Sequence, residues 1–496
     1  MKILLLYPRF PRTFWGFKYA LPFIGKKATF PPLGLLTVAT LLPQDWEKRI
    51  IDLNIGDFSG KDLQWADLIF ISAMALQKES VWEIIYHAKK LGKKIVAGGP
   101  LFTTGYEEFF NNIDHFVLGE AEDVMPLLVQ DLERGSLQKI YQSNQRPEAD
   151  KIPLPSWELI DMNKYASMSI QFSRGCPFNC EFCDIVYLNG RVPRVKNKEQ
   201  VLAELDALYF NGWRGNVFFV DDNFIGNKIK LKREILPAII GWMGAKRHPF
   251  SFHTQVSINL ADDLELIKLM TMAGFDTVFI GIESPKEESL KGCGKVQNIN
   301  RDLLNSIRIF QNNGLQVQAG FIIGFDQDTP SIFDRMTLFI QKSGIAIAMV
   351  GLLQAPPKTR LWDRMKKEGR LVSQASGDNT NCTINFVPKM NREILLAGYK
   401  KLTAHIYSSK YYYQRLKTFL KEYKPERKKI SRRISFSRLL AFPKSLWFLG
   451  FMHKERIYYW ELLFWCFFRK PKFFPMVIDM AIKGFHFRKI SENHLC

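Results

Sequence analysis

Three cysteines lie close together in the segment 173–183, SRGCPFNCEFC. Cys176, Cys180 and Cys183 follow the spacing C-x₃-C-x₂-C, and the other four cysteines are scattered far along the chain. Common zinc sites use four ligands, usually as two pairs of cysteine or histidine. Thiolates on one short loop also suit an iron–sulfur cluster. The segment predicts a metal centre with three protein ligands and one open position. A zinc site completed by a distant Cys or His is the alternative.

Length and composition indicate a globular protein of several domains. The 496 residues, 47% of them hydrophobic, are enough for about three domains of ~150 residues each. The first residues, MKILLLYPRF, lack a small-residue cleavage site and predict a first strand rather than a signal peptide. We therefore expect a cytoplasmic protein. Seven cysteines at irregular spacing favour reduced thiols and metal ligation over a disulfide framework.

The net charge of +20 is concentrated at one end of the chain. Residues 400–496 contain 22 Lys and Arg against 6 Asp and Glu, so the rest is nearly neutral. The segment 366–496 predicts a mostly helical domain rich in basic and aromatic residues. Its apolar pieces SLWFLGFM and LLFWCFF are far shorter than the ~18 residues that span a bilayer. We expect no transmembrane helix.

Two interpretations of this C-terminal domain are open. Its helices cover the rest of the protein, with the aromatic residues in a core, or they lie on an anionic membrane surface. The second would place the protein at the inner face of the membrane as a peripheral partner. Nucleic acid is the least favoured partner, although aromatic and basic residues also suit base stacking and phosphate contacts.

Residues 1–140 alternate short apolar runs with helical patterns. The runs KILLLY, KRIIDL, DLIFIS, KKIVAGG and DHFVLG predict five buried parallel strands in a doubly wound, Rossmann-like α/β domain. Ligands bind beyond the carboxyl ends of such strands. Glycines there allow a ligand to approach the backbone, or are turn residues only. Those ends carry Ser72, Gly98, Gly99, Gly119 and Glu120.

A second α/β unit follows a linker predicted at 141–165 from its KIPLPSW segment. Residues 166–365 contain six β/α units, too few for a closed eight-fold barrel, and predict an open, partial (β/α)₆ barrel of the TIM type. Chemistry in such barrels lies at the carboxyl ends of the strands, and the cysteines follow the first of them. The strands are expected at 168–173, 215–221, 251–256, 276–281, 316–323 and 346–351.

The cysteine spacing, the aromatic Phe182 and the position after the first barrel strand resemble the signature of the radical S-adenosylmethionine (radical SAM) superfamily. The resemblance implies that Cys176, Cys180 and Cys183 hold a [4Fe–4S] cluster whose fourth iron binds S-adenosylmethionine. An electron donor such as flavodoxin or ferredoxin then allows cleavage of the sulfonium to a 5′-deoxyadenosyl radical. The cofactors carry this chemistry, while the protein orients them and excludes water.

The same resemblance implies contacts with S-adenosylmethionine at other strand ends. Acidic side chains after the second and fourth strands accept from its ammonium or ribose, and a glycine-containing fifth strand lies along its adenine. Each of these residues is alternatively a helix cap or turn residue. The implied contacts are Phe182, Asp221, Asp222, Asn223, Glu283, Ser284, Gly320, Ile322 and Gly324.

An α/β domain placed before such a barrel resembles the cobalamin-binding radical SAM family, on the segments PPLGLLTVATLL, ADLIFISAM, VAGGP and LGEAED. The resemblance covers roughly residues 1–365 and implies that the first domain takes the nucleotide tail of cobalamin and presents the corrin to the barrel. The residues implied to contact cobalamin are Ser72, Gly98, Gly99, Gly119, Glu120 and Glu122.

Two positions depart from the family pattern. The D-x-H-x-x-G loop that supplies a cobalt ligand in many members contains no histidine here, in YPRFPRTFWGF. Several relatives without it are still thought to bind cobalamin with its lower face unligated or bound to water, and a cofactor-free domain is the alternative. In the segment APPKTRLWDRM, Lys358 stands where the family's P-G-T-x-L pattern has glycine.

The resemblance implies a cobalamin-dependent methyltransferase that acts on an unactivated carbon of a small hydrophobic substrate, such as a hopanoid or a bacteriochlorophyll precursor. An oxidative cyclase or rearrangement enzyme with the same cofactors is the first alternative. A non-catalytic, zinc-containing adaptor for membranes or nucleic acid is the alternative of another class.

Overall fold

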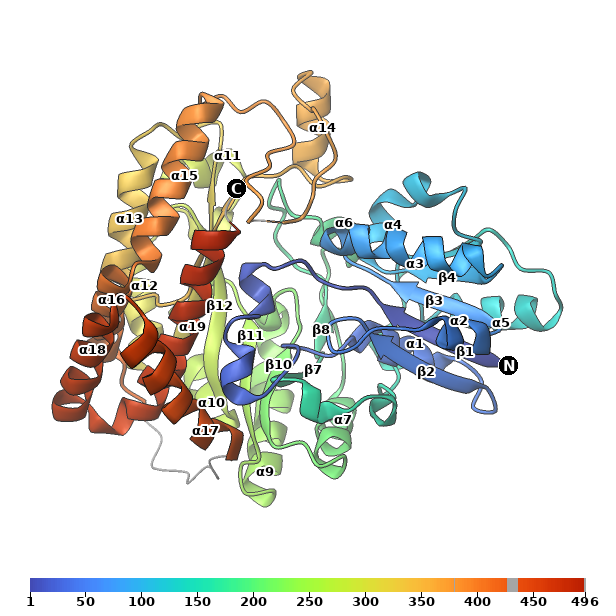
Figure 1. Cartoon of the computed structure of the whole chain (residues 1–496), viewed down its shortest axis with the longest axis horizontal. Coiled ribbons are helices and arrows are strands. Elements are labelled where there is room, and N and C mark those ends of the chain that lie inside the picture. The colour runs from blue at the N-terminus through green and yellow to red at the C-terminus, as the bar shows by residue number, and fades with distance from the viewer. Residues whose placement is uncertain (379, 426–435, 495–496) are drawn as a thin grey trace.

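The computed structural model describes residues 1–378, 380–425 and 436–494, and Figure 1 shows their arrangement. Two parallel sheets lie beside one another, with their flanking helices. Of the C-terminal helices, α15 (Arg392–Tyr407), α16 (Ser409–Glu422) and α18 (Arg456–Arg469) lie on the side of the second sheet away from the first domain, whereas α14 (Arg360–Lys367) does not.

The first sheet is parallel and has the strand order β2-β1-β3-β4-β5-β6. Helices α1 (Leu33–Leu41) and α5 (Met125–Glu133) cover one face, and α2 (Gly60–Trp65), α3 (Lys78–Lys90) and α4 (Pro100–Gly105) cover the other. Apolar side chains therefore occupy both faces, and the predicted doubly wound domain is confirmed. The strands are β1 (Lys2–Tyr7), β2 (Glu47–Asp52), β3 (Leu68–Ser72), β4 (Lys94–Gly98), β5 (His115–Leu118) and β6 (Ile140–Gln142).

The sixth strand differs from the sequence-based expectation of five. Strand β6 lies at the start of the segment expected to be a linker, and it pairs with β5 at the edge of the sheet. Three residues are too few to show an alternating pattern, so only their pairing with β5 identifies them as a strand.

The second sheet is also parallel, in the order β14-β13-β12-β11-β10-β7, and is open because its two end strands do not pair. The predicted partial barrel is confirmed. Side-chain caps start several outer helices, such as Asn197 before α7 and Asp302 before α12. The strands are β7 (Ser167–Ile170), β10 (Gly215–Phe219), β11 (Phe250–Gln255), β12 (Phe275–Glu283), β13 (Gln316–Ile323) and β14 (Ala348–Leu352). The helices between them include α7 (Lys198–Phe210), α9 (Leu236–Ala245), α10 (Leu264–Ala273), α12 (Leu303–Asn312) and α13 (Ile332–Ser343).

The C-terminal region is helical, as predicted, and covers the open edge of the barrel. Tyr399 Oη donates to Val350 O at 3.0 Å, and Tyr407 donates to Ala348 O, so two carbonyls of β14 gain partners. No helix among the described residues is long and apolar enough to cross a membrane. The helices are α14 (Arg360–Lys367), α15 (Arg392–Tyr407), α16 (Ser409–Glu422), α17 (Phe436–Ser445), the π-helical turn Leu446–Met452, α18 (Arg456–Arg469) and α19 (Phe474–Asn493).

We expect the packing of α19 on α16 to be intolerant of one added methyl group. A Cβ at Gly484 would lie 2.3 Å from the ring of Tyr412, whose hydroxyl donates to Met480 O at 2.7 Å. Gly484→Ala should therefore lower the free energy of unfolding by about 1–3 kcal/mol. The matched control is Gly241→Ala in α9, where a Cβ meets nothing within 4 Å; it should raise stability by about 0.5–1 kcal/mol. Thermal unfolding measures both, and equal effects would contradict this account.

Candidate active site

The cysteine loop is closed at its base by a short antiparallel ladder between β8 (Ser173–Arg174) and β9 (Arg194–Val195). Within it, Cys176 N donates to Gly190 O at 3.1 Å. Gly175 has φ +103°, and a Cβ there would lie 3.0 Å from the Gly190 carbonyl. The loop therefore requires glycine immediately before the first cysteine.

Two aspartates at the end of β10 hold this loop in place. Asp221 is buried and accepts from Phe172 N at 3.2 Å and from Ser173 Oγ at 2.6 Å. Asp222 accepts from Gly175 N at 2.8 Å and from Asn189 Nδ2 at 2.9 Å. Both residues were expected to contact S-adenosylmethionine, and the structure shows their oxygens engaged by donors of the loop. Their position at the cysteines follows from the topology, because β10 pairs with β7.

A buried ion pair lies beside the three thiols. Lys295 Nζ is 2.7 Å from Glu283 Oε1, with side-chain exposures of 12% and 8%. Glu283 has φ +62°, a conformation that costs a non-glycine residue of order 1–3 kcal/mol. A Cβ at Gly281 would lie 2.2 Å from the Glu283 carboxylate, so this glycine makes room for the pair.

Burial and a neighbouring ammonium act in opposite directions on the three thiols. Burial raises the pKa of Cys176, Cys180 and Cys183, while the Lys295 ammonium acts in the opposite direction on all three. One lysine does not outweigh burial, so the thiols stay protonated when they are alone. Metal ligation stabilises the thiolate form.

Two arginines next to the cysteines bind two glutamates of the first domain. Arg174 Nη1 donates to Glu120 Oε2 at 2.7 Å, and its Nη2 lies 2.8 Å from Glu122 Oε1. Arg194 contacts both oxygens of Glu120, at 2.5 and 2.9 Å. None of these side chains is more than 15% exposed. Burial lowers the pKa of Arg174, but the two glutamates outweigh it and raise that pKa overall.

A cavity of about 480 Å³ lies where the first domain meets the cysteine loop. Gly119 and Glu120 contribute one wall, Cys180 and Cys183 a second, and residues 358–360 a third. Gly119 has φ +81°, and a Cβ there would point into open space. The expected cobalamin side and the expected cluster side therefore share one cavity.

Helix α14 secures the loop from the opposite side. Arg364 Nε donates to Glu181 Oε1 at 2.6 Å, and Leu361 N donates to Glu181 O at 2.9 Å. Just before this helix, Lys358 has φ +66°. Lysine thus keeps the left-handed backbone that glycine adopts easily, and this is how the departure from the P-G-T-x-L pattern is accommodated.

The remaining residues expected at cobalamin gather at the carboxyl edge of the first sheet. Gly99 has φ +91°, and a Cβ there would lie 2.7 Å from Ser72 Oγ. A Cβ at Gly98 would lie 3.0 Å from Val117 O. Two glycines thus allow neighbouring strand ends to approach, and neither residue lines the cavity.

The other residues expected to contact S-adenosylmethionine fall into a half-buried group and a buried group. Gly320 and Ile322 lie half-buried on β13, and the Phe182 ring is 6.2 Å from that of Phe325. Ser284 and Gly324 are buried away from the cavity, and Gly324 N donates to Asp328 Oδ2 at 2.9 Å. Ser284 and Gly324 therefore make structural contacts outside the cavity.

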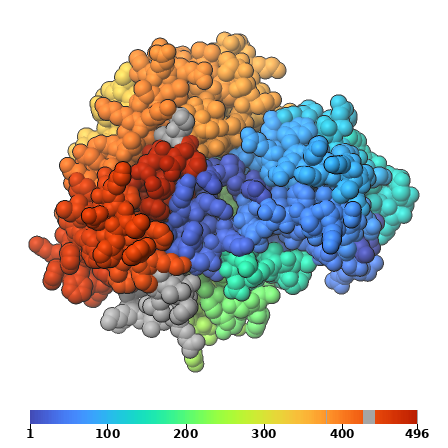
Figure 2. All heavy atoms as spheres, viewed as in Figure 1, coloured from blue at the N-terminus to red at the C-terminus, as the bar shows by residue number. Residues whose placement is uncertain are grey.

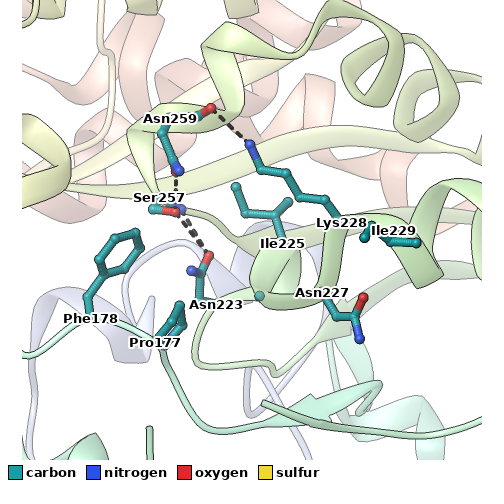
Figure 3. A pocket seen from close by; sticks show the side chains of 10 residues that line it. Pro177, Phe178, Asn223, Ile225, Asn227, Lys228, Ile229, Ser257 and Asn259 are labelled. Atoms are coloured by element: carbon teal, nitrogen blue, oxygen red, sulfur yellow. Dashed lines mark hydrogen bonds between the residues drawn. The ribbon is translucent and has the colours of Figure 1, made fainter. Parts of the chain in front are cut away.

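Asn223 lies at a second hollow of about 370 Å³, drawn in Figure 3. Its side-chain oxygen accepts from Ser257 N at 3.1 Å, and Ser257 Oγ donates to Asn259 Oδ1 at 2.6 Å. Pro177 and Phe178 of the cysteine loop close the other side. The lining contains none of the three cysteines, so this hollow is separate from the cavity at the thiols.

One of the described cysteines differs from the expectation that the thiols are reduced. Cys382 is disulfide-bonded, whereas Cys293 and Cys466 are free, as are the three loop cysteines. Within the described residues, no group of three or more His, Cys, Asp or Glu side chains could hold a single metal ion.

Comparison with known proteins identifies the family. The chain matches a B12 binding domain over residues 26–129, the radical SAM superfamily over 170–340 and a domain of unknown function (DUF4070) over 359–495. A hopanoid C-2 methylase of Rhodopseudomonas palustris is 33% identical over 93% of this chain and 88% of its own. The chain belongs to the B12-binding radical SAM family. It is a cobalamin-dependent radical SAM methyltransferase, which rules out the zinc-containing adaptor.

Two further matches agree with this family. An uncharacterized methyltransferase of Synechocystis sp. is 39% identical over 99% of this chain and 92% of its own. The fold resembles that of the radical S-adenosylmethionine methyltransferase TsrM from Kitasatospora setae, with a TM-score of 0.60 and 17% identity over 76% of this chain and 79% of the other.

The residues present fit the cofactors that this family requires. Three cysteines on one short loop form a ligand set that suits an iron–sulfur cluster, and the Lys295 ammonium beside them favours the thiolate form that such a cluster binds. On the cobalamin side, Glu122 Oε2 is buried and has no hydrogen-bond partner within the described residues, close to the turn that lines the cavity. A buried oxygen without a donor is costly, so a bound molecule that donates there would remove a penalty.

Sequence reasoning missed several residues around the thiols. Lys295 lies far from the cysteines in sequence, and no local pattern indicates that it pairs with Glu283. Arg174 was more accessible to prediction, because a cation two residues before the first cysteine is itself a signal. Thr103 of α4 and Arg360, the first residue of α14, also line the cavity, and only the fold brings these two helices there.

We expect the arginine–glutamate network to stabilise the protein more than an exposed pair does. Arg174→Met leaves Glu122 buried without its cation, and should lower the free energy of unfolding by about 3 kcal/mol. The matched control is Arg9→Met, whose partner Asp57 is 78% exposed; it should cost less than about 1 kcal/mol. Urea unfolding of the apoprotein measures both values, and similar losses would refute a dominant role of the network.

The buried Asp221 should make folding less favourable as the pH rises. Burial raises its pKa from 3.8 to about 7, although bonds from Ser173 and Phe172 oppose this. Between these pH values the folded chain keeps a proton that the unfolded chain releases, so stability falls across the window. Asp221→Asn should remove that contribution and give a flatter dependence between pH 4 and about 7. Urea midpoints across this range measure it, and parallel curves for both proteins would contradict the assignment.

Proposed function

We propose that this methyltransferase acts on an unactivated carbon of a hydrophobic, polycyclic molecule of the hopanoid kind. The observation that carries the proposal is an aromatic inner wall in the barrel. Phe218, His253 and Phe279 face inward from three adjacent strands and are half-buried, while alternate residues of these strands are fully buried under the helices. Burial lowers the pKa of His253 to about 4, so the imidazole is neutral and stacks on Phe218 at 4.8 Å.

The N-terminal segment completes this wall. Trp15 lies 5.0 Å from the Phe279 ring, and Phe30 lies 5.2 Å from the Phe218 ring. Trp15 is 43% exposed, which is unusual for a tryptophan packed against a barrel strand. Figure 2 shows the surface hollowed where this dark-blue segment meets the first domain, with green barrel residues at the bottom. Flat aromatic surfaces of this kind suit a flat apolar ligand.

The length over which one relative aligns with this chain supports a substrate of the hopanoid class. The hopanoid C-2 methylase aligns with 93% of this chain, which takes in most of the C-terminal region as well as both α/β domains. A shared substrate class is the simplest reason for two proteins to share all three parts.

The residues of this chain would prepare the site for the cofactors. Cys176, Cys180 and Cys183 would hold the cluster, and Gly119 with Glu122 would face cobalamin. When bound, these groups and S-adenosylmethionine supply radical formation and methyl transfer. The aromatic wall positions the acceptor carbon and excludes water, which protects reactive species from side reactions. A one-electron reductant such as flavodoxin or ferredoxin is required.

The function is tested by label transfer. Enzyme reconstituted anaerobically with both cofactors, given S-adenosylmethionine with a deuterated methyl group and lipid extracts, should add the label to a hopanoid-type lipid. Mass spectrometry separates this from the cyclase alternative, because methylation adds a carbon whereas cyclisation removes hydrogens. Cleavage of S-adenosylmethionine without labelling of a hopanoid-type lipid, or labelling of a tetrapyrrole instead, would overturn the proposed substrate class.

We expect Cys180→Ala to abolish the cluster while leaving the fold intact. Three cysteines supply all protein ligands, so the loss of one should reduce the iron content from about four per chain to near zero. The matched control is Cys466→Ala in α18, which also removes a buried free thiol and should retain full iron. Iron analysis with circular dichroism measures both, and equal iron in the two variants would contradict the ligand assignment.

A further inference from the structure

The outward face of the C-terminal region carries an unusual concentration of exposed aromatic residues. Helix α18 buries Tyr459, Leu462 and Cys466 against the protein, yet its opposite face is also apolar. On that face Ile457 is 71%, Phe464 58% and Phe468 76% exposed. Their spacing of seven and four residues places them on one side of the helix. A solvent-facing stripe would ordinarily be polar, and an exposed apolar surface of this kind is typical of an interaction site.

The preceding π-helical turn extends this stripe into one surface. Ring contacts connect Trp447 to Phe451 at 6.4 Å, Phe451 to Trp460 at 5.9 Å and Trp460 to Phe464 at 6.0 Å. Trp460 Nε1 donates to Gly450 O at 2.9 Å and locks the turn to the helix. We call this surface the aromatic patch; it comprises Trp447, Phe451, Ile457, Phe464, Phe467 and Phe468.

Positive charge flanks the aromatic patch at both ends of α18. Within the described residues, none of the nearby cations forms an ion pair; they are Lys454, Arg456, Arg469, Lys470 and Lys472. The acidic side chains are already engaged, because Glu461 pairs with Lys417 at 2.5 Å and Glu455 accepts from Ser409 N at 3.1 Å. The five cations outnumber these two carboxylates, so the net charge around the patch is positive.

We propose that the aromatic patch docks this protein on an anionic phospholipid surface. Aromatic residues between cationic ends suit the boundary between headgroups and acyl chains, where rings enter the apolar layer and lysine and arginine meet phosphates. A second copy of the chain is a poor occupant, because a two-fold interface would bring these cations together. Figure 1 shows α18 at the edge of the molecule farthest from the first domain, so docking there leaves the cavity free.

The proposal concerns binding alone and does not rest on the proposed substrate. It is tested by flotation of the holoenzyme with vesicles of phosphatidylcholine, with or without phosphatidylglycerol. The protein should float with the anionic vesicles, and added salt should weaken this binding. The double substitution Phe464→Ser/Phe468→Ser should reduce the partition coefficient between water and anionic vesicles about tenfold or more, because two rings that would enter the apolar layer of the bilayer are lost.

A matched control separates docking from general surface hydrophobicity. Phe210 on α7 is 74% exposed and has Lys246 Nζ 4.8 Å from its ring, so it offers the same chemistry elsewhere. Phe210→Ser should leave flotation unchanged.

The contribution of positive charge is tested separately. The double substitution Lys454→Gln/Arg456→Gln should weaken binding to anionic vesicles without changing the melting temperature. Absence of flotation, equal flotation of the Phe464→Ser/Phe468→Ser variant, or a dimer that those substitutions split would overturn the proposal. Preferential binding of single-stranded oligonucleotide over anionic vesicles would do the same.

Discussion

The buried contact of Arg174 and Arg194 with Glu120 and Glu122 joins the two α/β domains beside the cysteine loop. Each domain has its functional edge at the carboxyl ends of its strands, and these ion pairs join the two edges directly. Arg174 lies two residues before Cys176 in the sequence, so the contact of its guanidinium positions the thiol loop as well. A weak or mobile interface here would separate two cofactors that must exchange groups.

The same region shows why catalytic and structural roles are difficult to separate by sequence. Asp221 and Asp222 stand where the family contacts S-adenosylmethionine, yet their oxygens accept hydrogen bonds from the cysteine loop. The contacts that the structure shows for them are therefore those that hold the loop. Lys295 and Glu283, by contrast, form an ion pair next to the sulfur atoms and influence their charge directly.

Much of the fold could be predicted because alternating apolar runs identify parallel strands, and all six barrel strands were found within a few residues. The cysteine motif was predictable for another reason, since its spacing is local. The edge strand β6, the Lys295–Glu283 pair and the walls of the cavity were not, because each depends on tertiary contacts between distant segments. Family resemblance assigned Ser284 and Gly324 to S-adenosylmethionine from the segments GIES and AGFIIG, but residues just beyond a strand end form local hydrogen bonds, as the backbone N–H of Gly324 does with Asp328.

The central claim is that one cavity brings cluster and cobalamin together. Electron paramagnetic resonance of protein loaded with both the reduced cluster and cob(II)alamin tests it most directly, with singly loaded protein as the reference. The structure predicts a magnetic interaction between the two centres, seen as broadened lines and faster relaxation than in either singly loaded sample. A spectrum equal to the sum of the two separate spectra would contradict the claim.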